Sequence, residues 1–369
     1  TSQVKTLQLM EASLVPDSLV INSHKGQYQA HFKNDLLRNV QPFLANEPHF
    51  IVDENVARIY GEQLSLIVNH PNTILVQPAE EFKSLDVVSK IIQRLVANKI
   101  RRNHTIVAIG GGITQDLACF TASTILRGVD WVFVPTTLLA QADSCIGSKS
   151  SINVGDSKNI VGTFYPPKEI WIDTIFLRTL HQDEIRSGIG EILKVHAIES
   201  SDEFDRAAKS FELMLTDFDV LEQFIHSALF IKKRFIEIDE FDAGIRNIFN
   251  LGHSFGHAIE AATMFAVPHG IAVSMGMHVA SSVASARGLL QASHAERMKL
   301  VLAKNFSPYA AVQIEIQPMM AALMKDKKNS SSELGLILPI GERAEIQKIM
   351  IEPDAQFQQQ LADSLSALR

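Results

Sequence analysis

The chain has few cysteines, no long apolar run and no excess of basic residues. Its 369 residues include two cysteines, Cys119 and Cys145, and neither belongs to a CxxC motif. Two cysteines in a chain of this length exclude a disulfide framework, so we expect buried, reduced thiols. No apolar run reaches the ~18 residues of a membrane-spanning helix, so the sequence does not predict a membrane protein.

The charge balance is mildly acidic. Lys plus Arg is 34 and Asp plus Glu is 41, which gives a net charge of −7. Such a chain has no overall attraction to nucleic acid or membrane, so any basic cluster is expected to be local and suited to a small anion. Residues 1–5 lack the basic start and apolar stretch of a signal peptide, and we expect a cytoplasmic enzyme.

Short β-branched runs alternate with longer amphipathic stretches in the first half of the chain. Four runs are typical of strands: residues 49–52, 72–76, 105–109 and 130–134. Residues 85–98 have apolar positions at helical spacing. This alternation predicts an α/β fold with a parallel sheet. Ligands gather at the carboxyl ends of parallel strands, where Asp53, Gly110 and Thr136 lie in the sequence.

The pattern changes after the prolines at 166 and 167. It is mostly helical from about residue 177 to 302, and one strand-like run follows at 334–339. The length suits two domains of ~100–200 residues each. We therefore expect an α/β domain over residues 1–170 and a mainly α-helical domain over residues 171–369.

Gly110, Gly111 and Gly112 follow the third expected strand and open a helix-like stretch. Glycines let the backbone approach phosphate oxygens closely, and a helix N-terminus favours negative charge. The turn therefore suits the pyrophosphate of a dinucleotide. Its spacing is not GxGxxG, and a plain tight turn is the alternative.

A carboxylate and several histidines offer metal ligands. Glu191, His253 and His269 would supply three ligands and leave the fourth position of zinc open, as in catalytic zinc sites. His257 lies four residues after His253, on the same face if the segment is helical, so it could bind the metal or reach the substrate. For Glu191, whose neighbours are mostly apolar, a salt bridge to Lys194 is the alternative to a metal.

Several polar residues in this acidic chain suit an anionic ligand. Lys149, Lys158 and Asn159 lie beside small residues, which is typical of a phosphate or carboxylate site. Solvated surface lysines are the alternative. Arg246 and Asn250, just before the histidines, extend the set.

Three blocks of the sequence resemble the dehydroquinate synthase family of sugar phosphate cyclases. They are VPTTLLAQADS at residues 134–144, KNIVG at 158–162 and NLGHSFGHAIE at 250–260. The resemblance extends from about Asp53 to Met277. It implies an N-terminal Rossmann-like NAD domain and a C-terminal, mainly helical zinc domain. It also implies a homodimer, in which Arg127 reaches the phosphate bound by the neighbouring subunit.

The resemblance further implies roles for individual residues. The zinc ligands would be Glu191, His253 and His269, with Co²⁺ as another possible metal. The NAD contacts would be Asp53, Asn55, Glu80, Lys83, Gly111, Gly112, Asp116, Thr136, Thr137, Thr179 and Leu180, with Lys158 near the cofactor. The substrate contacts would be Asp143, Lys149, Asn159, Lys194, Lys232, Arg246, Asn250, His257 and one of Lys327 and Lys328, of which we choose Lys328.

The implied reaction converts 3-deoxy-arabino-heptulosonate 7-phosphate to 3-dehydroquinate and phosphate. NAD would oxidise a hydroxyl-bearing carbon, phosphate would leave, NADH would return the hydride, and an intramolecular aldol step would close the ring. Relatives that form valiolone look different at the positions of Asn159, Asn250 and His257, and relatives that form deoxyinosose look different at those of Arg246 and Asn250. This chain keeps the dehydroquinate synthase form at all four positions. Because a substrate carboxylate suits a guanidinium fork, Arg246 favours the heptulosonate.

The chain departs from the family where Ala79, Gln115, Ser148 and Ser157 replace usual glycines. Each adds a side chain near a ligand-bearing loop, so a cyclase of the amino-dehydroquinate, 2-deoxy-scyllo-inosose or valiolone type is the alternative. A metal-dependent polyol dehydrogenase is less favoured, because it would not need the anion-binding set. A non-catalytic remnant is disfavoured, because metal triad and anion cluster are both retained.

Overall fold

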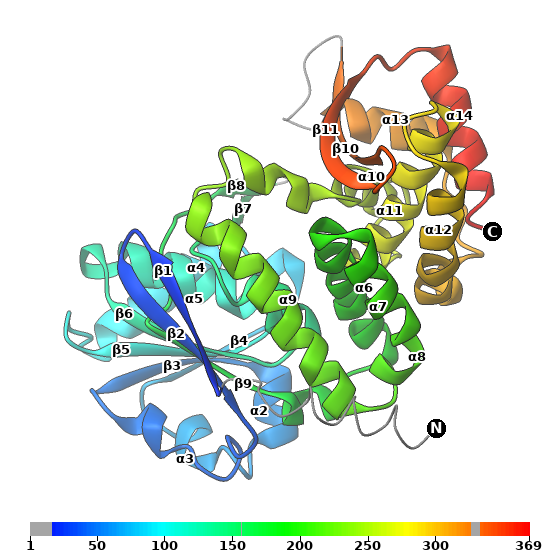
Figure 1. The fold of residues 1–369 in the computed structure, drawn as a ribbon. Helices are drawn as coiled ribbons and strands as arrows, with labels where there is room; N and C mark the ends of the chain where they lie inside the picture. Colours follow the sequence, from blue (N-terminus) through cyan, green and yellow to red (C-terminus); the bar gives the residue numbers. More distant parts are fainter. Residues whose placement is uncertain (1–16, 156, 326–332) are drawn as a thin grey trace, which may run out of the picture. The chain divides into compact units, whose positions relative to one another are not determined.

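The computed structural model describes residues 17–155, 157–325 and 333–369. The chain forms two compact units (Figure 1). The first unit extends to Thr136 and resumes over Ser144–Arg178, and the second comprises Thr137–Asp143 and Thr179–Arg369. The first unit continues past residue 170 because a late strand joins its sheet. The domain division expected at residues 170 and 171 stays a prediction.

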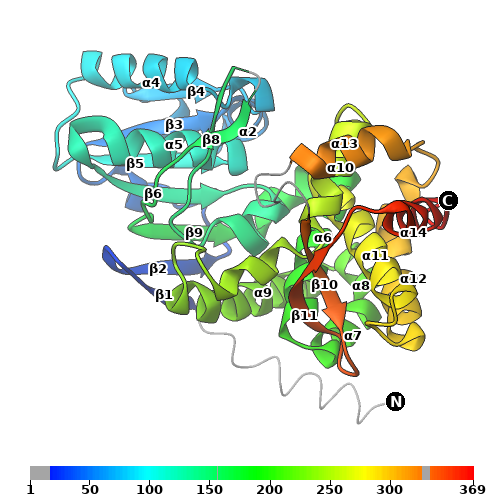
Figure 2. The same ribbon diagram turned by 90° about the horizontal axis from the view of Figure 1, so that it is seen from above.

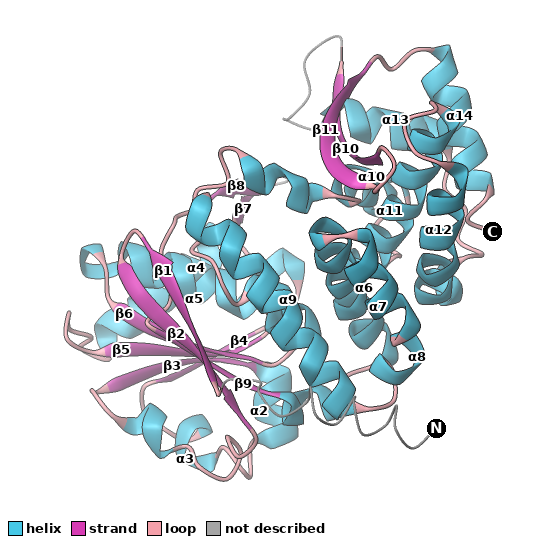
Figure 3. Ribbon diagram, viewed as in Figure 1, coloured by secondary structure: helices cyan, strands magenta, loops and turns pink. Residues whose placement is uncertain are grey.

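A seven-stranded sheet forms the centre of the first unit (Figure 3). Its order is β1 (Ser18–Ser23), β2 (Gly26–Lys33), β9 (Glu169–Asp173), β6 (Asp130–Pro135), β5 (Thr105–Gly110), β3 (Pro48–Asp53) and β4 (Thr73–Val76). β1 and β2 pair antiparallel, and all other neighbours pair parallel. The predicted parallel α/β sheet and its four predicted strands are confirmed. β1, β2 and β9 were not predicted.

Alternate residues of the central strands face opposite sides of the sheet. On one side, Phe50 and Val52 of β3 share a hydrophobic cluster with Val56 of α2 (Glu54–Tyr60) and Ile67 of α3 (Ser65–Val68). On the other side, α4 (Leu85–Ala97) and α5 (Gly112–Thr124) pack against each other, and α5 lies against β5 and β6 (Figure 2). This Rossmann-like layering places the start of α5 at the carboxyl end of β5.

A small antiparallel pair completes the first unit. β7 (Ile152–Val154) pairs with β8 (Ser157–Val161), and in the sequence both strands lie between β6 and β9. β8 carries Lys158 and Asn159.

The second unit is mainly helical, as predicted. Its helices are α6 (Gln182–Glu199), α7 (Ser201–Lys209), α8 (Phe211–Met214), α9 (Phe218–Ile238), α10 (His253–Ala262), α11 (His269–Ala286), α12 (Ala292–Phe306), α13 (Ile316–Lys325) and α14 (Ala355–Ser366). The predicted late strand is β10 (Leu334–Ile340), which forms a hairpin with β11 (Glu345–Ile351). α11 is buried along most of its length and packs against α6, α10, α12, α14 and β10.

The expectation of buried thiols is confirmed. Cys119 and Cys145 are buried and form no disulfide. No described helix combines the length and the apolar character that crossing a membrane requires.

Candidate active site

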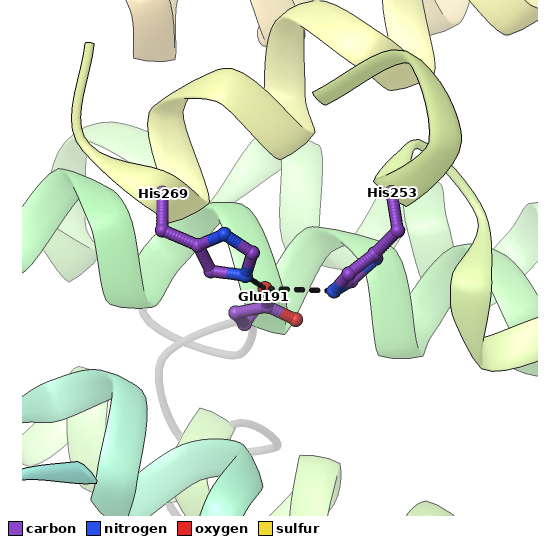
Figure 4. A group of neighbouring side chains, drawn as sticks. All are labelled: Glu191, His253 and His269. Atoms are coloured by element: carbon purple, nitrogen blue, oxygen red, sulfur yellow. Dashed lines mark ion pairs between the residues drawn. The ribbon is translucent and has the colours of Figure 1, made fainter. Parts of the chain in front are cut away.

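Close helix packing at glycines assembles the candidate metal centre. A Cβ atom at Gly190 would overlap the carbonyl oxygen of Gly270, so α6 and α11 cross with their backbones in contact. A Cβ atom at Gly276 would overlap the carbonyl oxygen of Gly252, which brings the start of α10 equally close to α11. The residues next to these glycines, Glu191, His253 and His269, therefore lie together (Figure 4).

The three side chains converge on one carboxylate oxygen. Glu191 Oε1 lies 3.7 Å from His253 Nε2 and 3.5 Å from His269 Nε2. Zinc holds nitrogen and oxygen ligands at ~2.0–2.2 Å, so ligand atoms on a tetrahedron around it are roughly 3.4 Å apart. The observed spacing is too long for hydrogen bonds and matches that geometry. The three residues present therefore fit a divalent metal ion.

The outer nitrogens of both imidazoles have partners. His269 Nδ1 lies 3.2 Å from Glu260 Oε2, and His253 Nδ1 lies 3.3 Å from the Leu251 carbonyl oxygen. An N–H at Nδ1 donates to these oxygens and leaves the Nε2 lone pair for a metal, the usual arrangement around metal-bound histidine. Glu260 lies in one of the blocks that resemble the family, but the sequence predicted no role for it. Its position three residues after His257 was the available signal.

The charges around the triad favour a cation there. Burial would raise the pKa of Glu191, but Lys194 and His269 hold it well below its usual range. Burial lowers the pKa of His253, with help from Lys194, so its imidazole is neutral and able to act as a ligand. Burial opposes a proton on His269, yet the nearby carboxylates of Glu191 and Glu260 raise its pKa to about 10. The site between these two carboxylates therefore attracts positive charge.

Asp143 links two buried lysines next to the triad. It lies in the π-helical turn η4 (Ala140–Ser144), and its oxygens Oδ2 and Oδ1 lie 3.1 Å from Lys194 Nζ and 2.6 Å from Lys232 Nζ. Lys194 also forms an ion pair with Glu191 Oε2. The carboxylate and cations, which come from η4, α6 and α9, thus form one chain of charges that ends at the metal triad.

Arg246 and Asn250 lie on the 3₁₀ helix η6 (Ile245–Asn250). Arg246 is buried, and its Nη1 donates to the carbonyl oxygens of Asp239 and Glu240, at 3.2 and 2.6 Å. Asn250 Nδ2 donates to the Asn247 carbonyl oxygen. His257 is exposed, and its ring stacks on that of His269 with 5.5 Å between the centroids.

The glycine turn of the first unit opens α5 as predicted. Gly111 is the N-cap residue, and Thr136 N–H donates to the Gly110 carbonyl oxygen across the neighbouring strands. Asp53, which was predicted to contact NAD, is buried and caps α2 by accepting from the N–H groups of Asn55 and Val56. Its NAD contact stays a prediction.

Lys83 is the centre of a second charge network in the first unit. Its Nζ lies 3.4 Å from Glu80 Oε1, 3.2 Å from Asp116 Oδ2 and 2.8 Å from Asn159 Oδ1. Asn159 has a left-handed backbone, with φ 52°, and its N–H donates to Asn153 Oδ1. Three predicted NAD contacts and one predicted substrate contact are therefore brought together. Sequence reasoning missed Asn153, which has no motif signal.

The other predicted residues that the structure describes are found in both units. Lys149 and Lys158 are exposed in the first unit, as is Arg127, whose φ is 65°. Thr137 Oγ1 accepts from the Ala140 N–H at the start of η4, and Thr179 and Leu180 precede α6. Lys327 and Lys328 lie outside the described residues.

The four departures from glycine differ in their surroundings. Gln115 and Ser144 form two hydrogen bonds of 2.6 Å: the amide of Gln115 donates to the Ser144 carbonyl, and the Ser144 hydroxyl donates back. Ser148 is buried, whereas Ala79 and Ser157 are exposed. Gln115 therefore fixes the loop after Asp143.

Known proteins resemble the chain over most of its length. The family models described as 3-dehydroquinate synthase N-terminal and C-terminal match residues 73–187 and 188–329. A 3-dehydroquinate synthase of Alkaliphilus metalliredigens (strain QYMF) is 33% identical over 344 residues, which cover 92% of this chain and 96% of that protein. One of Idiomarina loihiensis is 36% identical over 326 residues, covering 85% and 90%.

Solved structures share the fold over most of their length. A 2-epi-5-epi-valiolone synthase from Streptomyces hygroscopicus subsp. jinggangensis 5008, with NAD⁺ and Zn²⁺ bound, gives a TM-score of 0.78 at 27% identity and covers 92% of this chain and 96% of its own. A 2-deoxy-scyllo-inosose synthase complexed with carbaglucose-6-phosphate, NAD⁺ and Co²⁺ gives 0.79 at 22% identity, covering 94% and 99%. Because both halves of the family match in order and its members align over nearly their whole length, this chain belongs to the 3-dehydroquinate synthase family.

Proposed function

We propose that the chain converts 3-deoxy-arabino-heptulosonate 7-phosphate to 3-dehydroquinate and phosphate, as a lyase that depends on NAD and a divalent metal ion. The observation that carries this proposal is the triad of Glu191, His253 and His269 beside the buried cations Lys194 and Lys232. A metal ion bound there would polarise the oxygen of a substrate hydroxyl group, and the adjacent cations would bind the anionic groups of the same substrate.

The cofactors are proposed from the family and from the ligand set. The valiolone synthase and inosose synthase structures hold NAD⁺ with Zn²⁺ and Co²⁺, respectively. One carboxylate and two imidazoles accept either metal, and we propose zinc, with Co²⁺ as a substitute. When bound, the metal would polarise a substrate oxygen and NAD would accept and return a hydride. Gly111 and Gly112 at the start of α5 suit the NAD pyrophosphate.

The charge count supports an anionic substrate. The carboxylates of Glu191 and Asp143 balance the ammonium groups of Lys194 and Lys232. A divalent ion on the triad, together with Arg246, leaves the loaded centre positive. Such a centre attracts a substrate that carries both a phosphate and a carboxylate.

Each residue of the centre has a proposed role toward the substrate. Asp143 holds Lys194 and Lys232 in fixed positions, one on each carboxylate oxygen. Arg246 is oriented by two backbone carbonyls and presents its further N–H groups to the substrate carboxylate. His257 would donate a hydrogen bond to the leaving phosphate. Lys149, Asn159, Asn250 and one of Lys327 and Lys328 would complete the substrate contacts.

A cytoplasmic homodimer is also proposed. Leu126 and Arg127 have φ values of 51° and 65°, which are uncommon for side chains of this size, and strain of this kind accompanies functional positions. Arg127 is exposed and would bind the phosphate held by the partner subunit. The reduced cysteines suit a reducing compartment.

The test compares two substrates on the zinc-loaded protein with a catalytic amount of NAD. Phosphate release is measured with the heptulosonate 7-phosphate and with a sugar phosphate that lacks a carboxylate. We expect release with the heptulosonate and little with the other. Arg246→Lys keeps the charge but loses the planar fork, so it should raise KM for the heptulosonate by roughly 10–100-fold.

The contrary result is faster phosphate release from the sugar phosphate that lacks a carboxylate, with KM for the heptulosonate unchanged by Arg246→Lys. It would replace this proposal with a valiolone- or inosose-type reaction. Lys233→Met, which removes a partly exposed cation from the same region of the chain, is the matched control and should change neither KM.

A further inference from the structure

A second set of ligand atoms lies beside the triad. His257, Glu260 and His269 each offer one atom, and these atoms lie within 4.8 Å of one another. His257 and Glu260 are three residues apart on α10, a spacing that puts them on one helix face. His269 opens α11 and belongs to both sets.

The two sets use different nitrogens of His269. Its Nε2 faces Glu191 at 3.5 Å, and its Nδ1 faces Glu260 Oε2 at 3.2 Å. The ring can therefore bridge two ions, one on each side. Both sets consist of one carboxylate and two imidazoles. Zinc, cobalt and nickel bind such mixed nitrogen and oxygen ligands well, whereas calcium and magnesium prefer sites made of oxygen ligands alone.

Burial separates the two sets. Glu191 is almost completely buried, whereas His257 is exposed and Glu260 is partly exposed. Water competes better for an ion at the exposed set, and its ligand atoms are held less rigidly. The outer set is therefore the weaker of the two.

We propose that His257, Glu260 and His269 bind a second divalent transition metal ion, more weakly than the triad binds the first. This inference goes beyond the proposed function. The second ion replaces the proton that His269 Nδ1 shares with Glu260, and that proton passes to the solvent as the metal–nitrogen bond forms. The ion also engages His257, so excess metal is expected to slow turnover by withdrawing a residue that is proposed to contact the substrate.

The experiment counts bound ions without turnover. Metal-free protein is equilibrated with increasing Co²⁺, and bound cobalt per chain is measured by dialysis and metal analysis, with the visible absorption of cobalt reporting the coordination. We expect two ions in the wild type, one tight and one weak. Glu260→Gln keeps an oxygen for His269 Nδ1–H but loses the anionic ligand, so it should bind only the tight ion.

Three further variants fix the assignment. His257→Gln should also lose only the weak ion, His253→Ala should lose only the tight one, and His269→Ala should lose both. Circular dichroism confirms that each variant is folded before titration. Because cobalt is counted in the absence of substrate, the result is independent of whether the proposed reaction occurs.

The inference is overturned by either of two results. One is saturation of the wild type at a single ion across the Co²⁺ range. The other is a weak ion that persists unchanged in folded Glu260→Gln and His257→Gln variants.

Discussion

Lys194 binds one oxygen of Glu191 and leaves the other to the histidines. The two residues are one turn apart on α6, with Lys194 Nζ paired to Oε2, while Oε1 lies 3.7 and 3.5 Å from the Nε2 atoms of His253 and His269. The salt bridge and the metal ligand, which appear as alternatives in the sequence, are therefore compatible. The lysine holds the carboxylate in the orientation that a metal needs.

Replacing Lys194 with methionine should strongly destabilise the metal-free protein. The substitution leaves the carboxylates of Glu191 and Asp143 buried without their shared cation, and breaking a buried pair in this way costs about 3–5 kcal/mol. Urea unfolding of the metal-free protein measures the loss. Lys233→Met, which removes an i,i+4 pair to Glu237, is the control and should cost less than about 1 kcal/mol. Equal losses in the two variants would show that Lys194 does not stabilise the buried carboxylates.

Alanine at Gly190 should disrupt the metal centre, whereas alanine at Gly112 should leave it intact. A Cβ atom at Gly190 meets the Gly270 backbone and forces α6 and α11 apart, which costs about 1–3 kcal/mol and weakens zinc binding. A Cβ atom at Gly112 meets nothing within 4 Å, so stability should hold while NAD binding weakens. Thermal unfolding and titrations with zinc and NAD distinguish the two. Tight zinc binding by Gly190→Ala would be the unexpected outcome.

Glu260→Ala should lower the affinity of the triad for its metal ion by about 10–100-fold. This is the usual effect of losing a partner that orients a metal-bound histidine. Glu260 is the partner of His269 Nδ1, at 3.2 Å. Competition with a chromophoric chelator measures the affinity. Glu260→Gln retains the acceptor and should lose less affinity than Glu260→Ala. Equal affinity in the alanine variant and the wild type would show that Glu260 does not orient His269.

The stability of the NAD-free protein should depend on the protonation of Asp116. Burial raises the pKa of Asp116 to about 6, against the opposing effect of Lys83. The folded chain therefore binds this proton more tightly than the unfolded chain does, and the stability that the group contributes is lost as pH rises from about 4 to about 6. Asp116→Asn removes this dependence.

The pH dependence of stability is compared between the wild type and Asp116→Asn. Relative to Asp116→Asn, the wild type should lose up to about 3 kcal/mol of unfolding free energy between about pH 4 and pH 7. Urea unfolding of both proteins at several pH values measures the difference. A constant difference across this range would mean that Asp116 has its ordinary pKa in the folded chain.

Local patterns were sufficient to predict much of the fold. The strands β3, β4, β5 and β6 are apolar runs bounded by polar residues, and their pattern does not depend on distant partners. β1, β2 and β9 were missed because they are defined by pairing: Gln29 aligns with Glu169, residues far apart in the chain. For the same reason, the segment 137–143 gave no sign that it groups with the helical unit, where Leu138 packs beside Gly188.

The candidate site was only partly accessible from the sequence. Residue chemistry and resemblance suggested Glu191, His253 and His269, and the structure brings these side chains together. The glycine crossings that bring them together are tertiary contacts with no local signature. Glu260 was missed because its role depends on which nitrogen of His269 faces it, and that is fixed only by the packing of α10 against α11.

The proposed cyclase reaction is tested by measuring phosphate, dehydroquinate and NADH in one reaction. The zinc-loaded protein receives excess 3-deoxy-arabino-heptulosonate 7-phosphate and far less NAD, and dehydroquinate is measured by coupling to dehydroquinase. We expect equal amounts of phosphate and dehydroquinate, many turnovers per NAD and no lasting NADH. Accumulation of NADH in proportion to substrate consumed, or loss of NAD without phosphate release, would show that the protein is a dehydrogenase and not a cyclase.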